Sequence, residues 1–248
     1  MNIALIIGKK NSTGLPNKNI RKIMGRPSAE YAFLAAKHSL IEKTYVSTDS
    51  EEIKKIGESY GATIIDRPPN LAKSDSLTED VLTHAYGIIK QEISNISTIS
   101  LLFSNTPTVD VDLLNSAIIE LNKTKNYDSI FSVANYDMFT PSRARKINNN
   151  GIIEPFIDLG LIGNVSSIRN SAGSVYYCDL SIQVMKEVCL SNINEGNLPF
   201  KWQGKKSKAV FTDFGFDIDS EWQIPVVEYW LRKKGFTETA IPWGNEND

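Results

Sequence analysis

Short apolar runs rich in β-branched residues alternate with segments of helical periodicity along the first part of this chain. Apolar runs at 1–7, 43–48 and 62–66 predict strands, and helices are predicted at 28–40 and 49–60. Strands that alternate with helices at this spacing are typical of a parallel sheet with helices on both faces, and ligands bind such sheets at the carboxyl ends of the strands. The alternation therefore predicts an α/β fold.

The same pattern continues to the end of the 248 residues, which favours a single domain over 1–248. The last predicted helix carries an aromatic stripe that includes Trp222, Tyr229 and Trp230, and such a stripe is typical of core packing. The further elements predicted are strands at 98–103, 129–134, 173–178 and 208–212 and helices at 78–91, 112–124, 180–190 and 221–233.

Residues 136–170 lack this periodicity. Within them an Asn148-Asn149-Asn150-Gly151 turn separates two short runs at 145–147 and 152–154, which predicts a hairpin. We expect 136–170 to project from the main sheet as a small insert. Its apolar run Gly160 to Gly163 would pack on a partner subunit or cover the active site.

The first apolar run ends in a loop with two glycines and three lysines. Gly8 and Gly14 allow backbone N–H groups to approach an anion, while Lys9, Lys10 and Lys18 supply positive charge for phosphate oxygens. The loop matches neither the dinucleotide fingerprint nor the phosphate loop that ends in GKS or GKT. A phosphate-binding loop and an ordinary solvated lysine loop are therefore both compatible with it.

Composition excludes several classes of function. The 27 basic and 29 acidic residues nearly cancel, so there is no bulk electrostatic reason to expect nucleic acid or an anionic membrane as partner. Two cysteines and two histidines argue against a disulfide framework, a zinc site and a histidine-based triad. No apolar run approaches the roughly 20 residues that span a bilayer, and the chain begins without a basic, cleavable leader. We expect a cytoplasmic protein.

Two carboxylates lie close together near the end of the chain. Asp217 and Asp219 alternate in a strand-like segment, which predicts that both point to one face while Ile218 points outward. Two such carboxylates repel each other unless a cation lies between them, and Mg²⁺ is a suitable ion. The alternative is an acidic turn in which Asp219 caps the following helix. The lysine loop in the same chain favours the metal site.

Five segments follow one another in order over nearly the whole chain. They are Ile3-Ala4-Leu5-Ile6-Ile7, Asn11-Ser12-Thr13-Gly14-Leu15-Pro16-Asn17-Lys18-Asn19, Val46-Ser47-Thr48-Asp49, Arg67-Pro68 with Leu71-Ala72, and Asp217-Ile218-Asp219. Together they resemble the acylneuraminate cytidylyltransferases, also called CMP-sialic acid synthetases. The resemblance implies a Rossmann-like nucleotide-diphospho-sugar transferase fold. It also implies a homodimer in which the insert at 136–170 reaches toward the partner's site.

The activity that the resemblance implies is transfer of CMP from CTP to a 3-deoxy-2-ulosonic acid, with Mg²⁺ and release of pyrophosphate. Lys9, Lys18 and Asp217 would be the catalytic residues, and Asp217 and Asp219 the metal ligands. The implied CTP-binding residues are Gly8, Lys10, Asn11, Ser12, Gly14, Asn19, Arg67, Ser76 and Thr78. The implied acceptor-binding residues are Asn105, Thr106, Arg143, Arg169 and Ser174. For Arg143 a surface salt bridge is the alternative, although a guanidinium suits an acceptor carboxylate.

The chain departs from the family pattern at several positions. Lys9 replaces the usual arginine and loses its two-pronged hydrogen bonding, and Thr13 replaces a lysine whose charge Lys10 could supply instead. Where the family has Gln-Pro-Thr-Ser-Pro-Leu-Arg, this chain has Phe103-Ser104-Asn105-Thr106-Pro107-Thr108-Val109, and Asn-Gly-Ala becomes Ala172-Gly173-Ser174. The acceptor is therefore expected to differ from ordinary N-acetylneuraminic acid. The alternatives are a non-ulosonate acceptor, such as a phosphonate or a phosphorylated small molecule, and a nucleotide-binding protein without catalysis.

Overall fold

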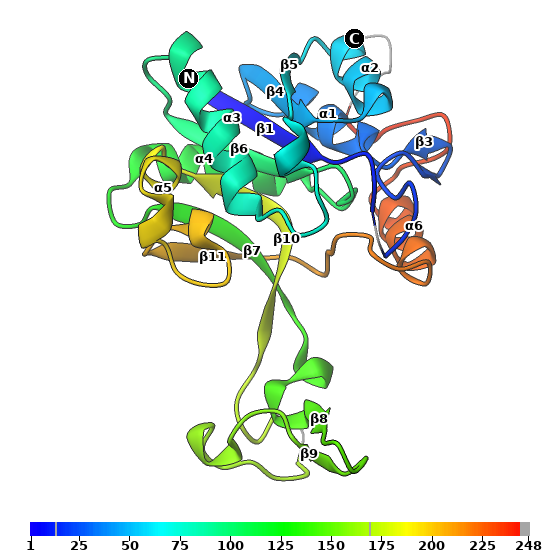
Figure 1. Cartoon of the computed structure of the whole chain (residues 1–248), viewed down its shortest axis with the longest axis vertical. Coiled ribbons are helices and arrows are strands. Elements are labelled where there is room, and N and C mark those ends of the chain that lie inside the picture. Colours follow the sequence, from blue (N-terminus) through cyan, green and yellow to red (C-terminus); the bar gives the residue numbers. More distant parts are fainter. Residues whose placement is uncertain (13, 169, 244–248) are drawn as a thin grey trace.

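The computed structural model describes residues 1–12, 14–168 and 170–243. Its centre is a seven-stranded sheet in the order β11-β7-β10-β6-β1-β4-β5 (Figure 1). All neighbouring strands are parallel except β10, which is antiparallel to β6 and to β7. The strands are β1 (Asn2–Gly8), β4 (Lys43–Thr48), β5 (Thr63–Asp66), β6 (Thr98–Phe103), β7 (Ser129–Asn135), β10 (Tyr176–Met185) and β11 (Ser207–Phe211). The predicted mostly parallel sheet is confirmed.

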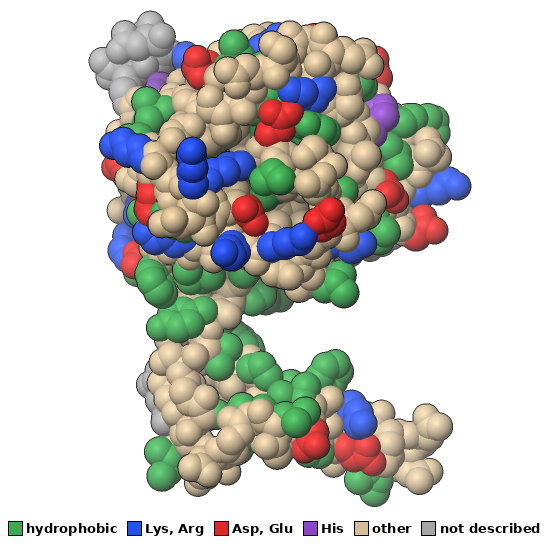
Figure 2. Space-filling view, turned by 90° about the vertical axis from the view of Figure 1, so that its left-hand side faces the viewer, with side chains coloured by type: hydrophobic (Ala, Val, Ile, Leu, Met, Phe, Trp, Pro, Cys, Tyr) green, Lys and Arg blue, Asp and Glu red, His purple; other side chains and the backbone are tan. Residues whose placement is uncertain are grey.

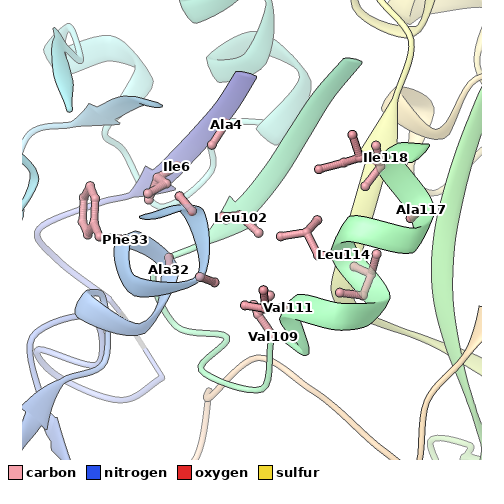
Figure 3. Packing of buried hydrophobic residues seen from close by; sticks show 14 of the residues in the cluster. Ala4, Ile6, Ala32, Phe33, Leu102, Val109, Val111, Leu114, Ala117 and Ile118 are labelled. Carbon is pink, nitrogen blue, oxygen red and sulfur yellow. The ribbon is translucent and has the colours of Figure 1, made fainter. Parts of the chain in front are cut away.

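Helices cover both faces of the sheet, as predicted. Ala4 and Ile6 of β1 point to one face and pack with α1, α2 and α4, as Figure 3 shows for part of this cluster. Ile3 and Leu5 point to the other face and pack with α3 and α5. The helices are α1 (Glu30–Lys37), α2 (Glu51–Ser59), α3 (Thr78–Glu92), α4 (Val111–Lys123), α5 (Val188–Ser191) and α6 (Gln223–Lys233).

A third apolar cluster joins the two ends of the chain. Leu15 from the loop after β1 packs in it with Phe216 and Ile218, which precede α6, and with Val227 and Trp230 of that helix. In Figure 1 the blue loop after β1 accordingly lies beside the orange helix α6. This cluster brings the lysine loop next to the acidic pair.

Strands β7 and β10 run out of the sheet into a projecting unit, here called the arm (136–175; Figure 1). The predicted hairpin forms within it, from β8 (Arg145–Ile147) and β9 (Ile153–Pro155), which pair antiparallel. Large apolar side chains of the arm are exposed. They are Met138, Phe139, Ile147, Ile152, Ile153, Phe156, Leu161 and Ile168.

Two of the predictions for local structure are wrong. The helix predicted at 180–190 is mostly strand, because β10 continues to Met185 and only Val188–Ser191 is helical. Residues 179–184 alternate between polar and apolar side chains, a strand pattern that contradicts the predicted helix. Their polar members Asp179, Ser181 and Gln183 are buried because β10 lies between β6 and β7. The aromatic stripe of α6 is only partly core, since Trp230 is buried while Trp222 and Tyr229 are exposed. None of the helices in the described residues is long and apolar enough to cross a bilayer.

Candidate active site

A cleft opens at the carboxyl ends of the parallel strands, where the predicted site residues gather. Gly8 closes β1, Phe103 closes β6, and Arg67 follows β5 directly. The sheet therefore places loops that are distant in sequence around one opening. The predicted residues that line this cleft are Gly8, Lys9, Lys18, Asn19, Arg67, Ser76, Thr78, Asn105 and Asp217.

The lysine loop and the acidic pair meet at the edge of this cleft. The Lys18 ammonium and the Asp219 carboxylate form an ion pair, with Lys18 mostly buried and Asp219 half exposed. Gly14 allows the loop to come this close, because a Cβ at that position would lie 3.1 Å from the carbonyl oxygen of Asp219. Lys9, Lys18 and Asp217 thus line one cleft, with Asp219 at its edge.

The acidic pair lies in an irregular segment and not in a strand. Ile218 is 1% exposed and packs inward beneath α6, so the prediction that it points outward is wrong. Asp217 points into the cleft, where burial and the neighbouring charge of Asp219 raise its pKa, against the effect of Lys18. The capping alternative for Asp219 is also wrong, because α6 begins at Gln223, its N-cap is Trp222, and no side chain of the described residues makes a cap hydrogen bond there.

The donor set fits a hard divalent cation that is completed by a ligand. Asp217 and Asp219 offer carboxylate oxygens, which suit Mg²⁺, and no group of three or more His, Cys, Asp or Glu side chains able to hold a metal occurs in the described residues. Mg²⁺ is commonly held by one or two carboxylates together with substrate phosphates and water. Such a pair would bind the ion weakly alone and more tightly with a polyphosphate.

Two polar atoms in the cleft have no hydrogen-bond partner among the residues described. Asn19 donates from Nδ2 to the carbonyl oxygen of Lys9 at 2.7 Å, which leaves its Oδ1 unpaired. Arg67 donates from Nη2 to the carbonyl oxygen of Ser47 at 2.7 Å, and its Nε is unpaired. Burial lowers the pKa of Arg67 to about 10, against the effect of Asp49. Buried polar atoms are rarely left unpaired, so this acceptor and this donor are available to a ligand in the cleft.

Gly8 is required for a reason other than the predicted approach of its N–H to an anion. A Cβ at this position would lie 2.3 Å from the Oγ of Ser104 and 2.7 Å from its Cβ. Glycine is therefore the residue that lets β1 end against the loop that follows β6.

Several predicted CTP-binding residues lie outside the cleft lining. The backbone N–H of Lys10 donates to Asp49 Oδ1 at 2.8 Å, so it is already used within the protein. Asn11 and Ser12 follow it on the exposed part of the loop, and Gly14 lies against Asp219. Thr13, where a family lysine is missing, is outside the described residues.

The predicted acceptor residues divide into two groups. Asn105 lines the cleft and also holds the acidic segment, because its Nδ2 and its carbonyl oxygen bond the backbone of Ile218 at 3.3 and 2.8 Å. Thr106 is 1% exposed and lies behind the cleft wall. Arg143 and Ser174 lie on the arm, away from the cleft of their own chain, and Arg169 is outside the described residues.

Sequence reasoning missed one cation and the apolar lining. Lys73 lies in the cleft, and its carbonyl oxygen accepts from Lys9 Nζ at 3.5 Å. Leu71, Val81 and Phe103 supply apolar surface beside it. The sequence signal for these residues was only that the loop after β5 follows a parallel strand. It therefore lies at the same edge of the sheet as the loop after β1.

A mostly parallel sheet with a lysine loop after its first strand and a carboxylate pair facing that loop defines a Rossmann-like protein of the nucleotidyltransferase class. Residues 3–150 match the family description "Cytidylyltransferase", and the chain belongs to that family. The predicted resemblance to the sialic-acid branch is borne out by its relatives.

The relatives differ in how much of their length is matched. The chain is 32% identical over 132 residues to the N-acylneuraminate cytidylyltransferase of Escherichia coli O18:K1:H7, which covers 53% of this chain and 30% of that protein. It is 29% identical over 183 residues to the CMP-N,N'-diacetyllegionaminic acid synthase of Legionella pneumophila, covering 70% and 76%. The chain spans about three tenths of the length of the E. coli protein and of several other curated relatives that it matches.

A solved structure supports the fold over the whole chain. The CMP:2-keto-3-deoxy-manno-octonic acid synthetase complexed with CTP superposes with a TM-score of 0.63 over 94% of this chain and 99% of that one, at 13% identity. Identity this low shows a common fold only. The predicted Rossmann-like nucleotidyltransferase fold is confirmed.

Proposed function

We propose that this protein transfers CMP from CTP to a sialic-acid-like 3-deoxy-2-ulosonic acid (a nonulosonate) and releases pyrophosphate, with Mg²⁺ as cofactor. The observation that supports the proposal is the ion pair between Lys18 and Asp219, which brings a carboxylate to the edge of the cleft that Lys9, Lys18 and Asp217 line. Family membership supplies the choice of CTP. The named acceptors of the relatives, which include N-acylneuraminate and N,N'-diacetyllegionaminic acid, supply the acceptor class.

The nucleotide is bound by the lysines of the cleft together with two polar atoms that are unpaired in the described residues. Lys9 and Lys18 neutralise the triphosphate, as lysines do at phosphate sites. Arg67 donates from Nε and Asn19 accepts at Oδ1, which matches the acceptors and the exocyclic amino group of cytosine. Ser76 and Thr78, at the start of α3, lie beside them and suit the ribose.

Asp217 and Asp219 would hold Mg²⁺. When bound, the ion would offset negative charge on the phosphates of CTP. Asp219 contributes from the edge of the cleft, and Lys18 moves from that carboxylate to the phosphates once CTP enters. Asp217 is fixed deeper in the cleft by the bonds of Asn105 to the adjacent Ile218.

The reaction needs alignment and charge neutralisation more than covalent participation of the protein. The anomeric hydroxyl oxygen of the acceptor attacks the α-phosphorus and forms a new P–O bond, and its proton is lost to water. The bond from that phosphorus to the bridging oxygen breaks, and its electron pair leaves with pyrophosphate. Lys9 and Lys18 stabilise the charge that develops on the departing group.

The acceptor side is completed by a second copy of the chain. The arm carries Arg143 and Ser174 far from the cleft of its own chain, and its exposed apolar side chains need a cover (Figure 2). A homodimer in which each arm packs on its partner meets both conditions. We place this dimer in the cytoplasm, where nucleoside triphosphates are available.

Pyrophosphate release over a panel of acceptors tests the proposal. The panel contains N-acetylneuraminic acid, diacetamido nonulosonic acids, a 3-deoxy-octulosonic acid, a phosphonate and a phosphorylated sugar, each with CTP and Mg²⁺. We expect turnover only with the ulosonic acids and most with a nonulosonate. Turnover only with the phosphonate or the phosphorylated sugar would replace the acceptor class, and CTP binding without any turnover would contradict an enzymatic role.

A further inference from the structure

Asp179 is a fully buried carboxylate that the proposed reaction does not use. It is 0% exposed, and within the described residues no lysine or arginine forms an ion pair with it. Its oxygens accept three hydrogen bonds: from the hydroxyls of Ser132 and Thr212, and from the backbone N–H of Ser181 at 3.0 Å. A buried carboxylate without a cation is unfavourable unless it is satisfied in this way, so its position needs a reason.

Asp179 lies at the junction between the sheet and the arm. On one side of it β10 pairs with the end of β7 at the base of the arm, and on the other side with the core of β7. The register shifts between Cys178 and Gln183, and Leu180 adopts a φ of 61°. Gln183 holds this bulge, since its Nε2 donates to the carbonyl oxygen of Leu180 at 3.0 Å.

The same carboxylate anchors the segment that carries the acidic pair. Thr212 follows β11 and donates to Asp179, and Gly215 crosses directly above the network. A Cβ at Gly215 would lie 2.0 Å from Ser181 Oγ and 3.1 Å from Asp179 Oδ2. The next anchor is Ile218, which Asn105 bonds. Asp217 stands between these two fixed points.

We propose that Asp179 is a positioning residue for Asp217 and Asp219. It ties the end of β11 and the following turn to the bulge of β10, and so fixes the direction in which the two carboxylates leave the sheet. The role of those carboxylates as metal ligands rests on the proposed function, whereas the anchoring does not. Loss of the anchor lets the segment at 213–219 move and separates the carboxylates from Lys18.

The anchor is tested by removing the hydroxyl of Thr212. Thr212→Val removes one donor to Asp179 with little change in volume, and Thr212→Ser restores the hydroxyl. Ser129→Ala is the control: Ser129 is buried on β7, which pairs with β11, and its hydroxyl bonds the carbonyl oxygen of Gln203 and the hydroxyl of Ser207, away from the cleft. The readouts are hydrogen exchange of a peptide covering 213–219, Mn²⁺ affinity in the presence of CTP, and steady-state kinetics.

We expect Thr212→Val to speed hydrogen exchange at 213–219 with little change in exchange in β1. Mn²⁺ binding should weaken about tenfold. The value of kcat should fall about tenfold while the KM for CTP stays within twofold, as for a lost positioning contact. Thr212→Ser should be close to the wild type. Exchange at 213–219 that is unchanged, or changed equally by Ser129→Ala, would overturn the proposal. Hydrogen exchange needs no turnover, so a wild-type protein that is inactive with every acceptor would count against the proposed function alone.

Discussion

Lys18 and Asp219 are 201 positions apart in the sequence and form an ion pair at the edge of the cleft. Because Asp219 is half exposed, this pair contributes little to stability, about 0–1 kcal/mol for pairs of this kind. Its importance is positional: it shows that the loop after β1 and the segment before α6 can act on one ligand. A polyphosphate with a divalent cation would replace the pair with two stronger interactions.

Replacing Lys18 should impair nucleotide use and free Asp219. For Lys18→Met we expect kcat/KM for CTP to fall about 100-fold, in the range for removal of one group that stabilises developing charge. Mn²⁺ affinity without nucleotide should rise, since the competing ammonium is gone. The control is Arg21→Met, which breaks the neighbouring ion pair with Glu221 outside the cleft. An equal fall in kcat/KM for CTP in the two variants would show that Lys18 acts only by joining the loop after β1 to the segment before α6.

Asp217→Asn should remove the deeper metal ligand. We expect kcat to fall about 1000-fold, near the upper end for loss of a single electrostatic contact in an active site, and titration with excess Mg²⁺ should not restore it. Asp213→Asn changes a carboxylate of the same segment that pairs with Lys233 on the surface and should leave kcat within twofold. Activity of Asp217→Asn that recovers fully in high Mg²⁺ would argue that another residue holds the ion.

Gly8→Ala tests the packing reason for the glycine at the end of β1. The added methyl group would collide with Ser104, and overpacking of this kind costs about 1–3 kcal/mol of unfolding free energy. Denaturant titration measures this loss, and Ser104→Gly in the same chain should recover part of it. Gly87→Ala, on the exposed side of α3 with nothing within 4 Å of the new Cβ, should instead gain about 0.5–1 kcal/mol. A neutral Gly8→Ala would mean that the loop after β6 adapts freely.

A charge on the arm should break the proposed dimer. Ile153 is 68% exposed on β9, and we expect Ile153→Asp to sediment as a folded monomer and to lose activity through a higher KM for the acceptor, with CTP binding retained. Ile119→Asp places the same charge on a partly exposed position of α4 and should leave the assembly unchanged. A wild-type chain that is itself monomeric at assay concentrations, yet active, would refute the role of the arm.

Local sequence patterns predicted the fold well where a continuous apolar run marks a buried strand or apolar residues recur at helical spacing. The β-branched runs of β1, β4 and β6 and the apolar spacing of α3 and α4 were sufficient. β10 was missed although residues 179–184 alternate between polar and apolar side chains, and it contains a bulge that Gln183 stabilises through its bond to Leu180. The burial of its polar side chains depends on partners from other segments, such as Ser132 and Thr212 for Asp179 and Trp202 for Gln183.

Cleft residues that belong to a recognisable sequence motif could be predicted, whereas residues that only the path of a loop brings to the cleft could not. Lys9, Lys18, Asn19, Arg67 and Asp217 all reach the cleft. Lys73 follows no motif, and its place depends on the path of the loop after β5. The second role of Asn105, as an anchor for Ile218, requires contacts between segments more than 100 residues apart, which the sequence does not encode locally.

A crystal structure with CTP and Mn²⁺ tests the central claim most directly. We expect an anomalous Mn²⁺ peak in contact with the carboxylates of Asp217 and Asp219 and with triphosphate oxygens, with the Nζ atoms of Lys9 and Lys18 on the same triphosphate and cytosine beside Arg67 and Asn19. Triphosphate bound elsewhere, or Mn²⁺ without a contact to either carboxylate, would contradict the claim that the two ends of the chain act on one nucleotide.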